Sequence, residues 1–115
     1  MGRQRVGPSR GVIEALGLLG VQIRQARIDR EWTRVELADR IGVSAPTVDR
    51  IESGYPGVSI GNALMAAAAV GVPLYGTDDP DELARMRRRG EERLALLPKA
   101  VRHRVTEDED VDLDF

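Results

Sequence analysis

The most constraining feature of this 115-residue sequence is a pair of short helical segments joined by a three-residue glycine turn. Thr33 and Glu36 have the spacing of a capping box, in which each side chain accepts a hydrogen bond from the other residue's backbone N–H, and this predicts a helix over 34–41. Gly42 predicts the end of that helix in left-handed geometry. Ser44, with a proline two residues later, predicts the start of a second helix. Such a chain must pack two short helices across a tight turn.

Further helices are predicted on both sides of this pair. Apolar residues recur at helical spacing over 12–29, although two glycines weaken the first half, and we expect this helix to be firm from about Leu19 onward. Ser59 predicts the start and Gly71 the end of a fourth helix. Residues 72–75 predict a hydrophobic anchor with a short fifth turn, and no alternating strand pattern of useful length is present. The predicted fold class is therefore all-α, with five short helices in one domain.

The predicted core consists of the apolar residues that recur on one side of each helix. The second, third and fourth helices contribute Val35, Leu37, Ala38, Ile41, Val48, Ile51, Leu64, Met65, Ala67, Ala68 and Val70.

The chain divides into four predicted segments. These are a disordered arm over 1–11, the helical domain over 12–76, a C-terminal helix within 77–98 and a flexible acidic tail over 99–115. Residues 107–115 hold six acidic residues and no basic one, so the net charge of −2 comes from the tail and the rest of the chain is net positive. A terminal block of like charge is typical of an interaction tail or a solvated end.

Composition excludes several classes of protein. The chain has no cysteine, which excludes disulfides and thiolate sites, and its one histidine, His103, provides no pair for zinc or for a nucleophile relay. We therefore predict no enzyme activity, no metal and no cofactor. No apolar run reaches the ~18–20 residues of a membrane span, and the first residues lack the apolar stretch of a signal peptide. The prediction is a cytoplasmic binding protein without a membrane partner.

Residues 33–54 read TRVELADRIGVSAPTVDRIESG, and this span resembles the Cro/C1-type (Xre-type) helix-turn-helix family. The family pattern has E-L-A before the glycine turn and S-x-x-T-[IV]-x-R-[IW]-E-x-G after it. The matching residues here are Glu36-Leu37-Ala38, Ser44, Thr47-Val48, Arg50-Ile51-Glu52 and Gly54. The resemblance continues through SIGNALMAAAAVGV and covers roughly half of the chain. It implies a lambda-repressor-like fold and a nucleoid-associated transcriptional repressor that binds double-stranded DNA.

The resemblance places the second helix of the pair in the major groove. The implied DNA-contacting residues are Arg34, Ser44, Ala45, Pro46, Thr47, Asp49, Arg50, Tyr55 and Ser59. Two helix N-termini also offer backbone N–H groups to phosphates. Arg50 is the candidate for reading guanine, at about 1–3 kcal/mol of discrimination; its alternatives are a phosphate contact or a salt bridge to Asp49 or Glu52. Ala45 and Pro46 cannot hydrogen-bond a base edge, so specificity is expected to rest partly on DNA shape.

Three further residues are interpreted as scaffold. The resemblance implies an ion pair between Arg27 and Glu52, and Trp32 is interpreted as a plug over the core.

A module of this size contacts only a few base pairs, so we expect a homodimer on a palindromic operator. The expected dimer surface includes Leu74, Leu83, Met86 and Leu94.

The tail carries a second resemblance. GYPGVSIG after the recognition helix, a Leu-Pro-Lys segment and an acidic end resemble HipB-like antitoxins. This implies a HipA-like kinase toxin as partner, bound through Asp112, Leu113, Asp114 and Phe115. The alternatives for the tail are a solubilising end or competition with DNA for the basic face. The alternative functions are a stand-alone Xre-family regulator and, more distantly, a protein-binding adaptor.

Overall fold

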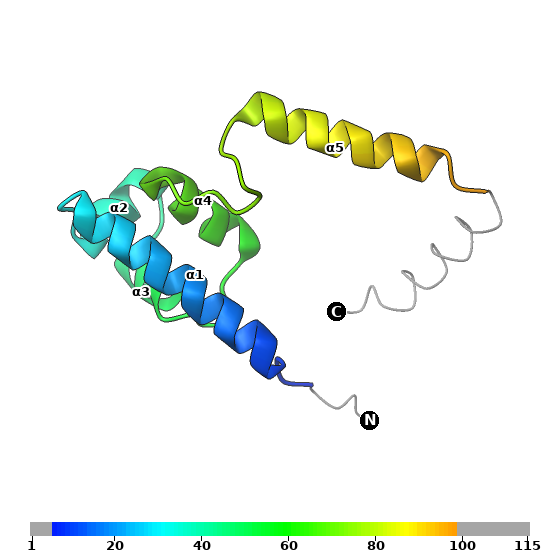
Figure 1. The fold of residues 1–115 in the computed structure, drawn as a ribbon. Helices are drawn as coiled ribbons and strands as arrows, with labels where there is room; N and C mark the ends of the chain where they lie inside the picture. Colours follow the sequence, from blue (N-terminus) through cyan, green and yellow to red (C-terminus); the bar gives the residue numbers. More distant parts are fainter. Residues whose placement is uncertain (1–5, 99–115) are drawn as a thin grey trace. The chain divides into compact units, whose positions relative to one another are not determined.

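The computed structural model describes residues 6–98, which contain five α-helices and no strand. The helices are α1 (Arg10–Asp29), α2 (Arg34–Ile41), α3 (Ala45–Glu52), α4 (Ile60–Val70) and α5 (Pro80–Ala95), shown in Figure 1. The chain divides into two units, Met1–Asp78 with α1 to α4 and Asp79–Phe115 with α5. The predicted all-α helix-turn-helix fold is confirmed.

The first unit contains four helices among its described residues, not the predicted five. Residues 74–76 form a bend, and no helical turn occurs within residues 72–76. Gly71 ends α4 in left-handed geometry with φ 80°, and the backbone N–H of Val72 donates back to the carbonyl oxygen of Ala67 at 2.8 Å. Pro73 follows without an N–H to donate, and Gly76 is again left-handed with φ 77°. The segment therefore completes the end of α4, and the predicted sixth helix is α5.

Helix α1 is longer and more regular than predicted. It begins at Arg10, inside the predicted arm, because the Ser9 hydroxyl accepts a hydrogen bond from the backbone N–H of Val12 at 3.3 Å. It then runs without a break to Asp29, so the expectation of firm helix only from Leu19 was wrong. One of the two glycines that weakened the pattern, Gly20, is buried where α1 crosses α3. Packing offsets the low helix propensity of glycine at this position.

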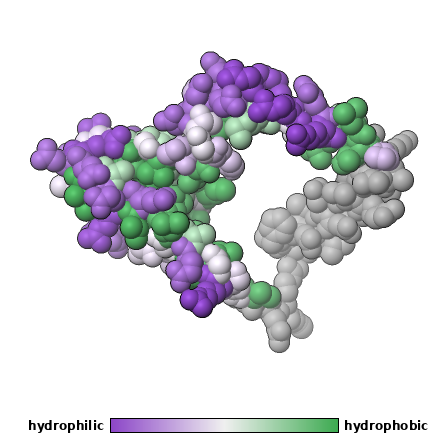
Figure 2. All heavy atoms as spheres, in the orientation of Figure 1, coloured by the Kyte–Doolittle hydropathy of each residue, from purple (hydrophilic) through white to green (hydrophobic). Residues whose placement is uncertain are grey.

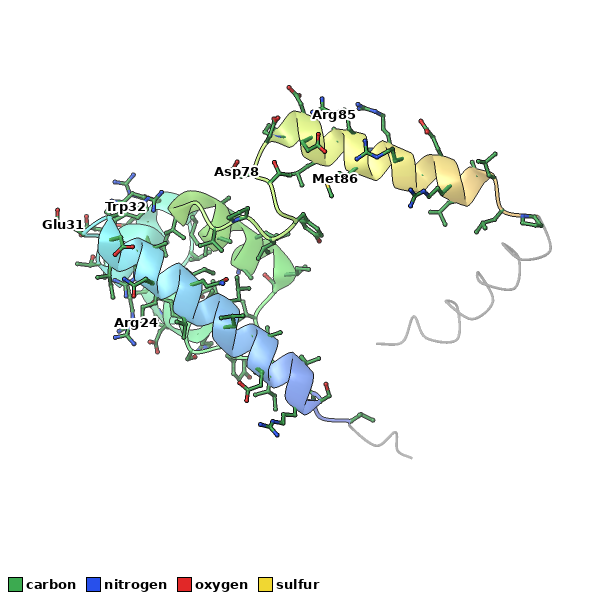
Figure 3. The ribbon with its side chains drawn as sticks, in the orientation of Figure 1. Arg24, Glu31, Trp32, Asp78, Arg85 and Met86 are labelled. Carbon is green, nitrogen blue, oxygen red and sulfur yellow. The ribbon has the colours of Figure 1, made fainter. Side chains whose placement is uncertain are left out.

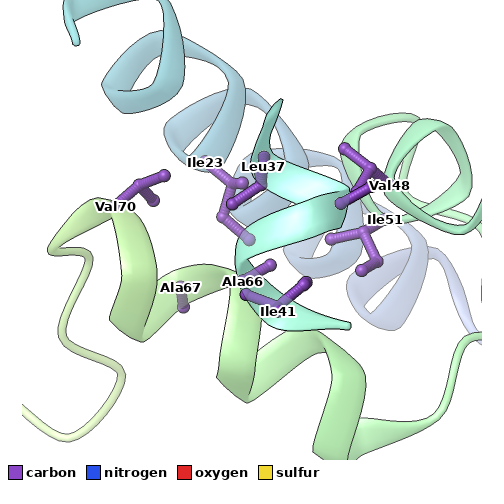
Figure 4. Close-up of a cluster of buried hydrophobic side chains, with 9 residues drawn as sticks. Ile23, Leu37, Ile41, Val48, Ile51, Ala66, Ala67 and Val70 are labelled. Atoms are coloured by element: carbon purple, nitrogen blue, oxygen red, sulfur yellow. The ribbon is translucent and has the colours of Figure 1, made fainter. Parts of the chain in front are cut away.

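The hydrophobic core lies between the first four helices (Figure 4). Its buried members are Ile23, Leu37, Ala38, Ile41, Val48, Ile51, Ala66, Ala67 and Val70. Three residues predicted to be buried are exposed instead: Val35, at 57%, Met65, at 47%, and Ala68. Each lies on a helix whose core-facing side is already filled, by Leu37 and Ile41 in α2 and by Ala66 and Val70 in α4.

Local capping produces the predicted boundaries of α2, α3 and α4. The Thr33 hydroxyl accepts from the backbone N–H of Glu36, and the Glu36 carboxylate accepts from that of Thr33, both at 3.1 Å. Gly42 ends α2 with φ 72°, where a side chain would be strained. Ser44 and Ser59 cap α3 and α4. The geometry of Gly42 and the Ser44 cap together define the turn between α2 and α3.

Helix α5 is held by ion pairs along its own surface and buries none of its residues. Two of its arginines have acidic partners one turn away: Arg85 lies 2.8 Å from Glu82, and Arg87 lies 2.9 Å from Glu91. The hydrogen bond from Arg85 lowers the pKa of Glu82. Figure 2 shows mainly hydrophilic residues along this helix, and Figure 3 labels Arg85 and Met86 on it.

Candidate nucleic-acid interface

The candidate interface is built around α2, the turn after it and α3. The backbone N–H of Val43 donates to the carbonyl oxygen of Ala38 at 3.0 Å and completes the end of α2. Val48 and Ile51 are fully or nearly buried and attach α3 to the core. Since the buried residues occupy one side of α3, the other side faces solvent.

The start of α3 is a tightly bonded cap. The Ser44 hydroxyl accepts from the backbone N–H of Thr47 at 3.3 Å, and the two hydroxyl oxygens lie 2.9 Å apart. Ser44 is exposed and Thr47 half-buried. The helix dipole places positive charge at this end and at the Thr33 end of α2, which suits an anionic group such as phosphate. The structure thus brings the two predicted hydroxyl contacts together at one helix N-terminus.

The outward side of α3 presents both hydrophobic and charged groups. Pro46, Asp49 and Arg50 are exposed, whereas Ala45 is partly buried and packs against the core. Within residues 6–98, Arg50 forms no salt bridge, so neither alternative pairing, with Asp49 or with Glu52, is present. The hydrogen-bond donors of its guanidinium are therefore available to a partner outside the described residues.

Arg34 has a more specific environment than the sequence indicated. Its Nε lies 3.4 Å from Oε1 of Glu52 and 3.7 Å from Oδ1 of Asp49. The first residue of α2 is therefore attached to two successive turns of α3. This arginine links the two helices of the motif and remains partly exposed to solvent.

The predicted partners Arg27 and Glu52 form a buried ion pair. Nε of Arg27 donates to Oε2 of Glu52 at 2.6 Å, and Nη2 donates to Oε1 at 3.0 Å. Nη1 donates to the backbone carbonyl oxygen of Trp32 at 2.7 Å. The hydrogen bond to Glu52 raises the pKa of Arg27 above its ordinary value, although burial opposes this. The pair connects α1 to the end of α3 and to the segment before α2.

Trp32 covers the edge of the core between α1 and α2. It is half-buried and packs against the core residues. The guanidinium carbon of Arg40 lies 3.9 Å from the centroid of its ring, and that of Arg30 lies 5.8 Å away. Figure 3 shows Trp32 beside Glu31, beyond the end of α1. The interpretation as a core plug fits this position, and the ring also forms a cation–π contact with Arg40.

The segment between α3 and α4 holds two more candidate contacts. The backbone N–H of Tyr55 donates to the carbonyl oxygen of Arg50 at 2.9 Å, and the phenol is exposed. Ser59 is also exposed, and its hydroxyl accepts from the backbone N–H of Asn62 at 3.1 Å. Gly57 lies against the Tyr55 ring, where a Cβ would collide with it. The backbone of Tyr55 is therefore attached to the end of α3, and the absence of a side chain at Gly57 leaves room for its ring.

Sequence reasoning missed the close approach of α1 to α3. A Cβ on Gly20 would overlap the carbonyl oxygen of Glu52 and would lie 2.8 Å from that of Ile51. Gly17 and Gly20, one helical turn apart, were the available signal. The predicted tail contacts (Asp112, Leu113, Asp114 and Phe115) lie outside the described residues.

Comparison with known proteins agrees with this geometry. A family model described as helix-turn-helix matches residues 23–76, from the second half of α1 to the end of the segment after α4. No curated protein and no solved structure matches the chain. Within residues 6–98, no helix has the length and apolar character of a membrane span, and no cluster of three metal-ligating side chains occurs. Residues 23–76 therefore match the helix-turn-helix family of the Cro/C1 (Xre) type, which supports a DNA-binding transcription regulator.

Proposed function

We propose that this protein is a sequence-specific transcriptional repressor that binds a palindromic operator in the nucleoid as a homodimer. The observation that carries the proposal is Arg50, exposed in the last turn of α3 without a salt bridge to the described residues, on a helix whose N-terminus is capped, as is that of α2. An arginine in the major groove donates two hydrogen bonds to O6 and N7 of guanine. Backbone N–H groups at the starts of α2 and α3 hold phosphate oxygens.

The remaining candidates act around this central contact. Ser44 and Thr47 bond phosphate at the start of α3, and Tyr55 and Ser59 meet the backbone from the segment after it. Ala45 and Pro46 allow close approach and contact a thymine methyl group. Contacts to phosphate fix the position of the protein on the duplex, and contacts to base edges determine the sequence it prefers.

An exposed apolar surface supports the homodimer. A cavity of about 290 Å³ is lined mainly by apolar residues, among them Leu16, Leu19, Val58, Ile60 and Leu74. Figure 2 shows hydrophobic residues at the surface of the first unit. Burying this surface against a second copy removes it from water. Since Ile51 and Tyr55 also line the cavity, the dimer contact would adjoin α3. Sedimentation equilibrium that finds only monomer at operator-saturating concentrations would contradict this part of the proposal.

Replacing Arg50 with alanine is expected to weaken base preference while leaving general DNA affinity. The duplex for this test is the sequence that the wild-type chain enriches from a randomised pool, compared with a scrambled duplex of equal length. Loss of the bidentate contact should reduce the preference about 5–150-fold, which corresponds to ~1–3 kcal/mol. Fluorescence anisotropy measures both affinities. Arg24→Ala, at an exposed position of α1, is the matched control and should leave the preference unchanged. An equal loss on both duplexes would show that Arg50 reads no base.

We further propose that this repressor is the antitoxin of a HipA-like kinase toxin. The support is the sequence of the tail, where acidic residues alternate with Leu113 and Phe115 at the end of the chain. Deleting 107–115 is expected to abolish capture of a HipA-like kinase encoded beside this protein and to leave operator affinity within about twofold. The double substitution Leu113→Ala with Phe115→Ala keeps the charge and should also weaken capture. Undiminished capture by the deletion variant would leave the stand-alone regulator as the better account.

A further inference from the structure

An acidic side chain lies on the side of α3 that the proposed function directs at DNA. Asp49 is exposed, precedes Arg50 in the chain and lies one turn after Ala45. A carboxylate close to DNA is repelled by the phosphates unless a cation lies nearby or a base donor pairs with it. The position of Asp49 therefore requires a physical explanation.

Arg34 is the nearby cation. Its Nε lies 3.7 Å from Oδ1 of Asp49 and 3.4 Å from Oε1 of Glu52, which in turn is held by Arg27 at 2.6 Å. The side chains of Arg27 and Glu52 are buried, at 8% and 3% exposure, whereas Arg34 is 43% and Asp49 is 63% exposed. The two arginines and the two carboxylates offset one another's charge. Asp49 is thus connected through Arg34 to a buried anchor.

The chemistry of the major groove determines which base a carboxylate selects. An ionised carboxylate only accepts hydrogen bonds. Guanine presents the acceptors N7 and O6, and thymine presents the acceptor O4, so both repel it. Adenine has a donor at N6, but its N7 acceptor lies beside that donor. Cytosine presents the N4 amino group without an acceptor on its own major-groove edge, and it is the base that aspartate pairs with there.

We propose that Asp49 reads a cytosine through its N4 amino group, and that Arg34 is a positioning residue that orients the Asp49 carboxylate and offsets its charge. The inference rests on the proposed function, because it assigns a second base-reading contact on the same helix. Ala45 and Pro46 have no polar side-chain atom, so Asp49 and Arg50 provide the charged contacts on the outward side of α3. Each half-site should then contain a cytosine read by Asp49 and a guanine read by Arg50.

The experiment selects duplexes from a randomised pool with the full chain, followed by sequencing of the enriched molecules. The Asp49→Asn side chain both donates and accepts and suits adenine N6 and N7. One position of the motif should therefore change from cytosine to adenine, with the cytosine preference reduced about 5–150-fold. Asp29→Asn removes the same charge from the exposed end of α1 and should leave the motif unchanged.

Arg34 is tested by two variants in the same selection. Arg34→Gln should weaken the cytosine preference at that position, because the Asp49 carboxylate loses its nearby cation. Arg34→Lys retains the charge and should restore part of the preference. Exposed pairs contribute little to stability, so the unfolding midpoint of Asp49→Asn should match that of the wild type, which excludes misfolding as the cause of a changed motif.

The outcomes separate this inference from the function on which it rests. A wild-type motif that Asp49→Asn leaves unchanged would overturn the reading of cytosine and would leave the proposed repressor intact. An equal change in affinity for every duplex, without a change at one position, would also overturn it. A wild-type chain that enriches no motif would overturn the proposed function, and this inference with it.

Discussion

Replacing Glu52 with alanine is expected to lower the free energy of unfolding by about 3–5 kcal/mol. The substitution leaves the Arg27 guanidinium buried without the carboxylate that accepts two of its hydrogen bonds. It also removes the closer of the two carboxylates near Arg34. A small domain has only about 5–15 kcal/mol of stability in total, so a large share of it would be lost. Urea unfolding followed by the fluorescence of Trp32, the one tryptophan, measures the difference.

Two further variants separate the buried charge from the rest of the network. Asp49→Ala removes an exposed carboxylate near the same arginine and should cost less than about 1 kcal/mol. The double variant Arg27→Met with Glu52→Leu replaces both charges by apolar groups and should recover most of the loss. A Glu52→Ala protein within about 1 kcal/mol of wild type would show that the pair does not anchor α3.

Replacing Gly20 with alanine is expected to destabilise the domain by about 1–3 kcal/mol or more, as overpacking does. The added Cβ would overlap the carbonyl oxygen of Glu52, and a helix backbone cannot yield as a flexible side chain does. The helices α1 and α3 must then separate. The same urea titration measures the loss, and operator affinity should fall with it because α3 carries the reading residues.

Gly17→Ala is the matched control for this prediction. A Cβ at Gly17 meets nothing within 4 Å, so alanine is accommodated there. Its higher helix propensity should stabilise the domain by up to about 1 kcal/mol. Two identical substitutions one turn apart are thus expected to act in opposite directions. A Gly20→Ala protein as stable as the Gly17→Ala protein would contradict the close packing of α1 on α3.

The sequence predicted the helix-turn-helix well because its signals are local. The bonds around Thr33 and Ser44 form within three residues, and Gly42 adopts its left-handed φ through its own lack of a side chain. Such signals can be recognised from a few consecutive residues, without knowledge of the fold. The starts and ends of α2, α3 and α4 therefore follow from sequence chemistry alone.

The remaining features depend on contacts between distant parts of the chain. Periodicity could not tell whether Val35 faces the core, because an eight-residue helix has too few turns to define one side. Helix propensity alone made Gly20 a weak point of α1. The reason for a glycine there is the close approach of the α3 backbone, which the sequence does not reveal. Arg34 was interpreted alone, although its partners lie fifteen and eighteen residues later, on a helix whose orientation only the fold determines.

The central claim is that the outward side of α3 meets DNA bases while the helix N-termini hold phosphate. Backbone amide chemical shifts of the full chain, recorded by NMR with and without the selected duplex, test it most directly. We expect the largest changes at residues 33–36, 44–50 and 55–59, and small changes along the exposed side of α1. Largest changes outside these three segments, or no change on adding duplex, would contradict the account.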